Sequence, residues 1–210
     1  MDYVNDMRVI KMSKNGNNSE DMPGSKYFKI YQQPTGGIRF DVEMSESIET
    51  DIIEYSDLFN LLRTVHPNDE VHVHLSNFGG CCHTGFRLCQ AFKSCAAPVI
   101  MYVEGNCYSM GSVLALSGKI LLMSKYAFLH FHNYSQVIGG KASEVTSEIT
   151  EYNKHFKDIL VYLCSPFLTK KEIGLILKDE DVYIRGIDGE TLVNRIKRHF
   201  PQQTYTGLLK

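Results

Sequence analysis

The sequence lacks several features that would define a function class at once. No apolar run approaches the roughly 18 residues needed to span a bilayer, since the densest stretch, 99–103, is followed by Glu104 and Gly105. The N-terminus lacks the basic-then-apolar order of a secretory signal, so we expect a cytoplasmic protein with no membrane partner. No GxxxxGK[ST] motif is present, so this chain has no phosphate-binding loop of that type for ATP.

Charge and cysteine content exclude further classes. The 22 basic and 24 acidic side chains give a net charge of −2, which argues against a protein that binds nucleic acid through a strongly basic face. The six cysteines include no paired CxxC, and neighbouring residues in Cys81-Cys82-His83 would point to different faces of a strand or helix. We interpret the cysteines as reduced thiols and expect no metal and no cofactor.

The length and composition of the chain indicate one globular domain. The 210 residues, 43% of them hydrophobic, can bury a sizeable core. Residues 1–25 are polar and predict a flexible N-terminal arm. We place the domain at 26–200 and a C-terminal tail at 201–210.

Hydrophobic periodicity predicts an α/β fold. A helical stripe over 48–62 follows Ser45 and Ser47, which are two candidate caps, and a long stripe extends from Val145 to Leu163. Thr169 opens another helix with the pattern of a capping box. Strands are expected at 27–32, 38–44, 71–75, 99–103, 120–123, 127–132 and 182–184, and further helices at 84–96, 109–117 and 190–197. This alternation favours a largely parallel sheet with right-handed crossovers.

Two strand-to-helix turns could place backbone N–H groups around a reacting carbonyl. Glycines in 75–80 allow a sharp turn and a close approach to a ligand. In 105–111, Ser109 begins a helix, where free N–H groups favour developing negative charge. A helix cap explains a serine at this position equally well. The G-x-S-x-G elbow is not met, because Cys107 stands in place of its first glycine.

The block from Leu75 to about Ile196 resembles the ClpP serine peptidases, the proteolytic subunits of the Clp protease. Four motifs in the family's order carry the resemblance: Asn77-Phe78-Gly79-Gly80 for its Ser-Pro-Gly-Gly turn, Tyr108-Ser109-Met110-Gly111 for its Ala-Ser-Met-Gly segment, Leu129-His130-Phe131-His132-Asn133 for its histidine strand, and Asp181-Val182-Tyr183 for its aspartate segment. The order Ser, His, Asp differs from that of chymotrypsin and of the α/β-hydrolases.

The resemblance implies a site and a fold. Ser109 would be the nucleophile, His132 the general base and later acid, and Asp181 the carboxylate that orients His132. The backbone amides of Gly80 and Met110 would form the oxyanion hole. The implied fold is the ClpP/crotonase-like superhelical βαβ repeat, with a mostly parallel sheet and a protruding handle helix.

Several positions leave alternatives open. His130 shares a strand face with His132, and Asp179 lies close to Asp181, so only the motif register selects one of each pair. Tyr108 stands where the family has a small residue, which affects access to the nucleophile. The family's Gln-Pro after the histidine is also missing.

The resemblance predicts an endopeptidase that cuts unfolded polypeptides inside an oligomeric chamber. Its partners would be peptide or unfolded protein substrates and an AAA+ unfoldase that uses ATP. The subunits would form heptameric rings stacked as a tetradecamer, without nucleic acid. The alternatives are a catalytically weak or inactive ClpP-like structural or regulatory ring subunit and a crotonase-type acyl-CoA enzyme. A divergent viral or phage member that processes capsids is also left open.

Overall fold

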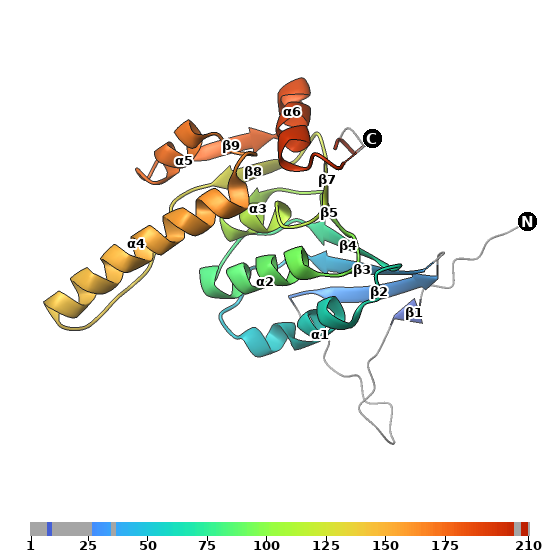
Figure 1. Ribbon diagram of the computed structural model, residues 1–210, viewed down its shortest axis with the longest axis horizontal. Coiled ribbons are helices and arrows are strands. Elements are labelled where there is room, and N and C mark those ends of the chain that lie inside the picture. The colour runs from blue at the N-terminus through green and yellow to red at the C-terminus, as the bar shows by residue number, and fades with distance from the viewer. Residues whose placement is uncertain (1–7, 10–26, 35–36, 204–206, 210) are drawn as a thin grey trace, which may run out of the picture.

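A computed structural model describes residues 8–9, 27–34, 37–203 and 207–209 of the chain (Figure 1). The predicted arm at 1–25 lies outside the described residues except for Arg8–Val9, which form strand β1. In the predicted tail at 201–210, residues 204–206 and 210 also lie outside them.

The larger sheet has six strands in the order β1-β2-β3-β4-β5-β7. After β1, their bounds are β2 (Lys29–Pro34), β3 (Ile38–Met44), β4 (Glu70–Leu75), β5 (Val99–Val103) and β7 (Ile120–Met123). β3, β4, β5 and β7 pair in parallel, whereas β1, β2 and β3 pair antiparallel. The predicted α/β class with a mostly parallel sheet is therefore confirmed.

Helices cover one face of this sheet, on which the alternate strand residues are buried. The 3₁₀ helix η1 (Ile52–Tyr55) leads into α1 (Ser56–Thr64), which lies beside α2 (Cys82–Ser94) (Figure 1). Strand side chains such as Val71 and Val73 and helix side chains such as Leu58 and Phe92 are fully buried in the common core. Burial of such apolar side chains, roughly 1.5–3 kcal/mol each, stabilises the packing of these layers.

Ser109, His132 and Asp181 each lie directly next to a strand of a second, three-stranded sheet. It has the order β6-β8-β9, with bounds β6 (Cys107–Tyr108), β8 (Phe128–Phe131) and β9 (Val182–Arg185). β6 pairs parallel to β8, and β9 pairs antiparallel to β8. Strand β6 is too short to show any periodicity, and it was not predicted. The short helix α3 (Met110–Ala115) follows it after Ser109.

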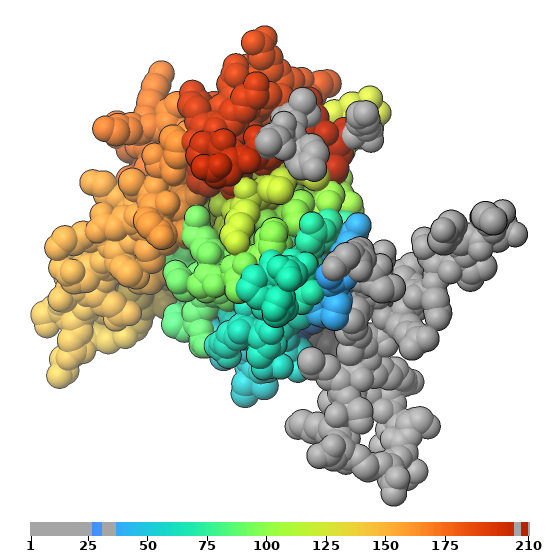
Figure 2. Space-filling model, turned by 45° about the vertical axis from the view of Figure 1, so that its right-hand side comes forward, coloured from blue at the N-terminus to red at the C-terminus, as the bar shows by residue number. Residues whose placement is uncertain are grey.

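The long helix α4 (Ala142–Cys164) projects from the body of the molecule, as Figures 1 and 2 show. Its C-terminal part packs into the core through Phe156, Leu160 and Leu163. Ile149, in the N-terminal part of the predicted stripe, is 39% exposed. The expected protruding helix is present, and only part of its apolar stripe is used within this chain.

The remaining elements complete the domain, and one cap differs from expectation. They are α5 (Lys170–Ile176), the 3₁₀ helix η2 (Gly186–Asp188) and α6 (Glu190–His199). The prediction of Ser45 or Ser47 as a helix cap is wrong, because the helical segment begins with η1 and Asp51 accepts the N–H of Ile53 at 3.0 Å. Within the described residues, we find no helix with the length and apolar character needed to cross a membrane.

The predicted capping box of α5 is confirmed and extends into an ion pair with α6. Thr169 Oγ1 accepts the N–H of Glu172 at 3.2 Å, and the N–H of Thr169 donates to Glu172 Oε2 at 2.8 Å. Arg195 holds both carboxylate oxygens of Glu172, at 2.6 and 2.9 Å. Burial alone would raise the pKa of Glu172, but its hydrogen bonds with Arg195 and Thr169 outweigh burial and lower this pKa to about 2.

Glu172→Gln is expected to lower the free energy of unfolding by about 2 kcal/mol at pH 7, because a charge-assisted fork is replaced by a neutral side chain. The pKa of Glu172 is depressed in the folded state, so its stabilisation is present above its ordinary value of 4.5 and is lost as pH falls toward about 2. Urea unfolding at several pH values between 7 and 3 measures both effects. The exposed Glu148→Gln is the control, and a Glu172→Gln deficit that does not shrink below pH 4.5 would contradict this assignment.

Candidate active site

The glycine turn after β4 packs directly against the segment that carries Ser109. Gly79 has φ 85°, and a Cβ built on it would lie 2.6 Å from the carbonyl oxygen of Tyr108 and 2.8 Å from Ser109 Cβ. A side chain at Gly79 would therefore separate the two segments. The structure brings together the two turns that the sequence singled out.

Asn77 holds this turn in place, a role that the sequence analysis did not assign. Its side chain is fully buried, with Oδ1 accepting the N–H of Gly79 at 2.8 Å and Nδ2 donating to the carbonyl of Glu46. The carbonyl of Asn77 accepts the N–H of Tyr108 at 2.9 Å, which ties the turn to β6. An asparagine two residues before a glycine is the sequence signal for such a side-chain-supported turn.

Ser109 lies at the junction of β6 and α3 in a backbone conformation that L-residues rarely adopt. Its φ is 53° and its ψ is −125°, and its hydroxyl makes no capping hydrogen bond to the start of α3. Its N–H donates to the carbonyl of His130 at 2.8 Å, which fixes it to the end of β8. A non-glycine residue held at positive φ is a feature that concentrates at functional sites. The conformation disfavours the helix-cap interpretation of Ser109.

Ser109 and His132 line the same small pocket. His132 directly follows β8, and the remaining wall is mainly apolar. It includes Phe86, Met110, Val113, Phe131, Phe156 and Leu160. The predicted nucleophile and the predicted base therefore lie on the wall of one small cavity that is otherwise mainly apolar.

Asp181 directly precedes β9, and its carboxylate lies against His130. Asp181 Oδ2 is 3.3 Å from His130 Nε2, an ion-pair distance without hydrogen-bond geometry. Among the described residues, no hydrogen bond joins Asp181 to His132 or Ser109 to His132. Catalytic hydrogen bonds often tighten only when substrate binds. The three predicted residues thus lie in one region, but the carboxylate is on the other histidine.

Tyr108, the unusual neighbour of the nucleophile, is directed toward an aromatic cluster and is not among the residues that line the pocket. Its ring stacks on Phe78 at 5.9 Å between centroids and meets the rings of Phe128 and His130 edge-on at 5.1 and 5.8 Å. Edge-to-face pairs at these distances are favourable. Tyr108 is therefore held by aromatic contacts outside the pocket of Ser109.

The two amides predicted for the oxyanion hole belong to well-anchored backbone. Gly80 has φ 130° and bridges to Ile48, whose carbonyl accepts the N–H of Cys81 at 2.8 Å. Met110 is the first residue of α3, where a helix has N–H groups without partners in its own backbone. Gly79, the neighbour of Gly80, and Met110 both lie next to Ser109, and the role of the two amides as an oxyanion hole stays a prediction.

The thiols near the site are not prepared for nucleophilic chemistry. Cys107 is buried two residues before Ser109, and burial raises the pKa of its thiol to about 12. Burial also raises the pKa of Cys82, which lines the pocket. Because the thiolate is the reactive form, the hydroxyl of Ser109 is the better candidate nucleophile. The described His, Cys, Asp and Glu residues form no group of three that could hold a metal ion.

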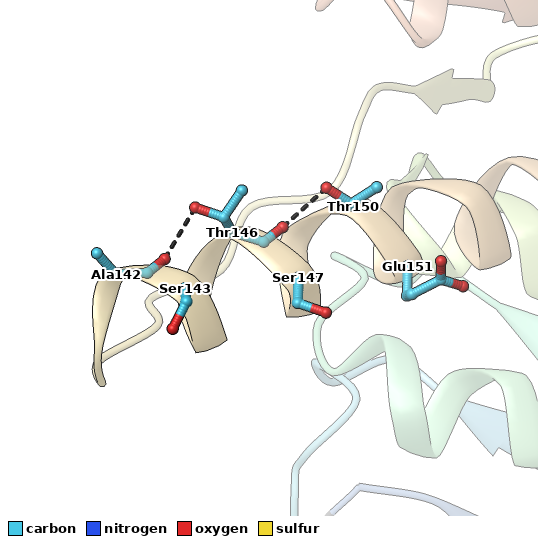
Figure 3. Close-up of a pocket in the computed structure, with 6 residues that line it drawn as sticks. All are labelled: Ala142, Ser143, Thr146, Ser147, Thr150 and Glu151. Carbon is cyan, nitrogen blue, oxygen red and sulfur yellow. Dashed lines mark hydrogen bonds between the residues drawn. The ribbon is translucent and has the colours of Figure 1, made fainter.

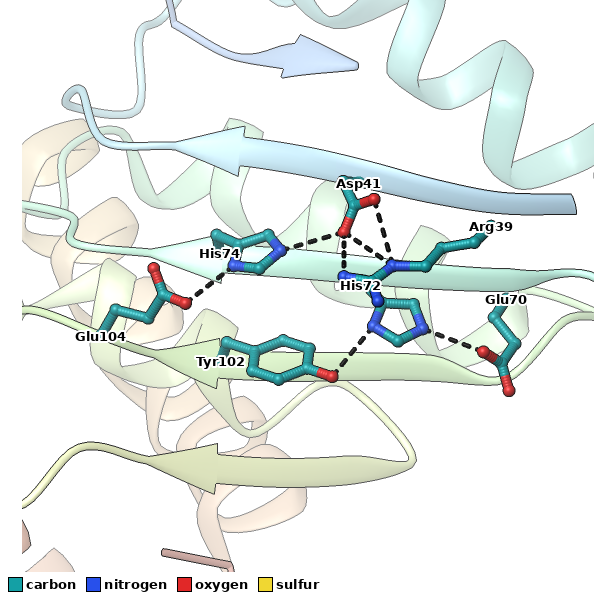
Figure 4. Close-up of polar contacts among 7 residues, drawn as sticks. All are labelled: Arg39, Asp41, Glu70, His72, His74, Tyr102 and Glu104. Atoms are coloured by element: carbon teal, nitrogen blue, oxygen red, sulfur yellow. Dashed lines mark hydrogen bonds and ion pairs between the residues drawn. The ribbon is translucent and has the colours of Figure 1, made fainter. Parts of the chain in front are cut away.

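A polar network on the opposite face of the large sheet is the other prominent cluster (Figure 4). His74 Nδ1 contacts Glu104 Oε1 at 2.9 Å and its Nε2 contacts Asp41 Oδ1 at 3.2 Å. Burial alone would lower the pKa of His74, but the contacts with Glu104 and Asp41 outweigh burial and raise this pKa. His72 is held similarly by Tyr102 and Glu70 at 2.9 and 3.0 Å. The network links residues of β3, β4 and β5. Each nitrogen of the His72 and His74 rings already has a partner, so neither ring offers a free base.

A hollow on α4 carries mainly small polar side chains (Figure 3). Thr146 Oγ1 donates to the carbonyl of Ala142, and Thr150 Oγ1 donates to that of Thr146, both at 2.8 Å. These hydroxyls are occupied by the helix itself and lie on the part of α4 that projects from the body. The hollow has no feature of a reaction site.

The α/β domain brings the glycine turn and Ser109, held at positive φ, into direct contact. The chain belongs to the Clp protease family, whose model matches residues 26–181. The match includes all the predicted site residues and ends at Asp181. It confirms the resemblance to the ClpP peptidases and favours a peptidase over an acyl-CoA enzyme. A search of curated proteins found no match.

Proposed function

We propose that this protein is a serine endopeptidase of the ClpP type with Ser109 as its nucleophile. The observation that carries the proposal is the placement of Ser109, which is held at φ 53°, packed against Gly79 and directed to one pocket with His132. An activated nucleophile next to a base and to backbone donors is the arrangement that acyl transfer requires.

The proposed reaction is acyl transfer through Ser109. His132 takes the proton of Ser109 Oγ as the oxygen attacks the substrate carbonyl carbon, and the resulting oxyanion accepts hydrogen bonds from the amides of Gly80 and Met110. His132 then gives the proton to the leaving amine, and the peptide bond breaks. In the second half of the reaction, His132 takes a proton from water as the water attacks the acyl carbon. His132 then returns the proton to Ser109 Oγ, which releases the carboxylic acid product and regenerates Ser109. Asp181 orients His132 when its carboxylate is on that ring.

Substrates and assembly are part of the same proposal. The surroundings of Ser109 are apolar around Met110 and Phe156, which favours apolar side chains of an unfolded polypeptide next to the cleaved bond. The projecting helix α4, with its exposed Ile149, supports stacking of heptameric rings into a tetradecamer. An AAA+ unfoldase would deliver substrates to this chamber in the cytoplasm.

Covalent labelling tests the nucleophile directly. A fluorophosphonate is expected to label the purified full-length protein at Ser109, because the probe needs an activated serine and an oxyanion hole. Ser109→Ala should lose the label, and His132→Ala should slow it at least about 100-fold. Mass spectrometry of the labelled peptide identifies the site. The exposed Ser94→Ala is the control, and labelling that persists in Ser109→Ala would show that the assignment is wrong.

A ring subunit with weak or no activity is the second candidate function. The observation that favours it is the contact of Asp181 with His130 instead of His132. Such a subunit would form rings but would react with the fluorophosphonate slowly or not at all at any pH. Size-exclusion chromatography together with the labelling experiment separates the two candidates.

A further inference from the structure

Two histidines compete for one carboxylate at the proposed active site. His130 and His132 stack with their ring centroids 5.1 Å apart, and Asp181 lies beside His130. Because Asp181 precedes β9 at the same end of the sheet at which His132 follows β8, its side chain can serve either ring. The motif register names His132 as the base, whereas the structure places the carboxylate on His130.

The ring of His130 is fixed by its aromatic neighbours, so a change of partner requires movement of the Asp181 side chain. Tyr183 stacks on His130 with centroids 4.4 Å apart and an interplanar angle of 6°, and Tyr108 meets it edge-on at 5.8 Å. Both ring nitrogens of His130 are buried without a hydrogen-bond partner, and an unsatisfied buried polar atom is costly. The Asp181 side chain is 51% exposed, and among the described residues no hydrogen bond to its carboxylate fixes its rotamer.

The other charged groups near this pair are already engaged. Asp179 Oδ1 accepts a hydrogen bond from Asn133 Nδ2 at 2.8 Å. Arg185, at the end of β9, pairs with Asp188 at 3.1 Å. The titratable groups that face His130 are therefore Asp181, His132, Tyr108 and Tyr183, and Asp181 is the one carboxylate among them.

We propose that His130 is a positioning residue that controls where Asp181 acts, an inference that rests on the proposed function. When His130 carries protons on both nitrogens, it retains the carboxylate as an ion pair and leaves His132 without its orienting partner. When His130 is neutral, the pair weakens and Asp181 turns to His132. The protonation state of His130 therefore decides which of the two rings the carboxylate of Asp181 orients.

The pH profile of Ser109 reactivity distinguishes this role from a structural one. Activity of the wild-type protein requires both histidines to be neutral, so the logarithm of the labelling rate should fall with a slope approaching about 2 toward low pH. His130→Phe retains the aromatic stack but has no ring nitrogen. It is expected to show a slope of about 1 and labelling at least about threefold faster than wild type at pH 6.

The outcomes of this experiment are separable. His66→Phe, the same change at an exposed histidine away from the site, is the control and should keep the wild-type profile. A His130→Phe profile identical to wild type, or slower labelling at all pH values, would overturn the role of His130 while leaving Ser109 as the nucleophile. Absence of labelling in every protein would overturn the proposed function and this inference together.

A second measurement does not depend on turnover or on the fold of a His130 variant. Experimental structures of full-length Ser109→Ala at pH 5.5 and pH 8.5 should show Asp181 on His130 at the lower pH and on His132 at the higher pH. A carboxylate with the same partner at both pH values would overturn the exchange.

Discussion

Ser109→Ala is expected to lower kcat/KM for hydrolysis of an unfolded polypeptide at least about 10³-fold. The hydroxyl of Ser109 is the group that would form the acyl-enzyme, and alanine leaves only binding and the oxyanion donors. The thiols of Cys107 and Cys82 cannot replace it, because burial raises the pKa of each. Initial rates with a quenched fluorescent casein or peptide measure the loss.

The control and the contradicting result are well defined for this variant. Ser94→Ala, on the exposed end of α2, should retain wild-type kcat/KM. The circular dichroism spectrum of Ser109→Ala should match wild type, since only one oxygen atom is removed. Retention of more than about a tenth of the activity would exclude Ser109 as the nucleophile.

Asn77→Ala is expected to have the second largest effect, on both activity and stability. The N–H of Gly79 and the carbonyl of Glu46 lose their buried partner, which should cost about 2–3 kcal/mol of unfolding free energy. The glycine turn then loses its fixed position beside Ser109, and kcat should fall about 100-fold, the scale of a lost oxyanion donor. Urea unfolding and initial rates measure the two effects.

A matched substitution separates the effect of losing the turn from the effect of replacing an asparagine elsewhere. Asn60→Ala changes the same residue type on the exposed side of α1 and should alter neither quantity by more than experimental scatter. If Asn77→Ala loses stability but keeps its full kcat at a temperature where it is folded, the turn does not position the oxyanion donors.

Much of the fold was predictable, because hydrophobic periodicity records which side of an element is buried. The strand Val99–Val103 and the box at Thr169 appear as predicted. The first helical cap was not predictable from capping propensity alone. Ser45 and Ser47 have the right residue type, but η1 begins after Asp51, whose side chain accepts the first free N–H. Capping propensity is local, whereas the start of this helix is set by where Tyr55 and Leu58 enter the core.

The site was predictable as a set of residues but not as a set of contacts. Motif register selected Ser109 and His132, and the structure places both on one pocket. Strand periodicity showed that His130 and His132 share a face, yet it carries no information about the rotamer of Asp181. The contact between Asp181 and His130 depends on a side-chain torsion at the strand's beginning, which no sequence pattern specifies.

The location of Asp181 has a consequence for how the site fails. In the part of the chain that the structure describes, strand β9 is the edge of a three-stranded sheet and pairs along one side only, with β8. Edge segments open locally at a lower free energy than the core of a domain. Fraying of β9 would remove the carboxylate while Ser109, on the buried junction of β6 and α3, stayed in place. The protein would then lose catalytic competence on warming before it lost its fold, and a bound substrate that engages the histidines would delay that loss.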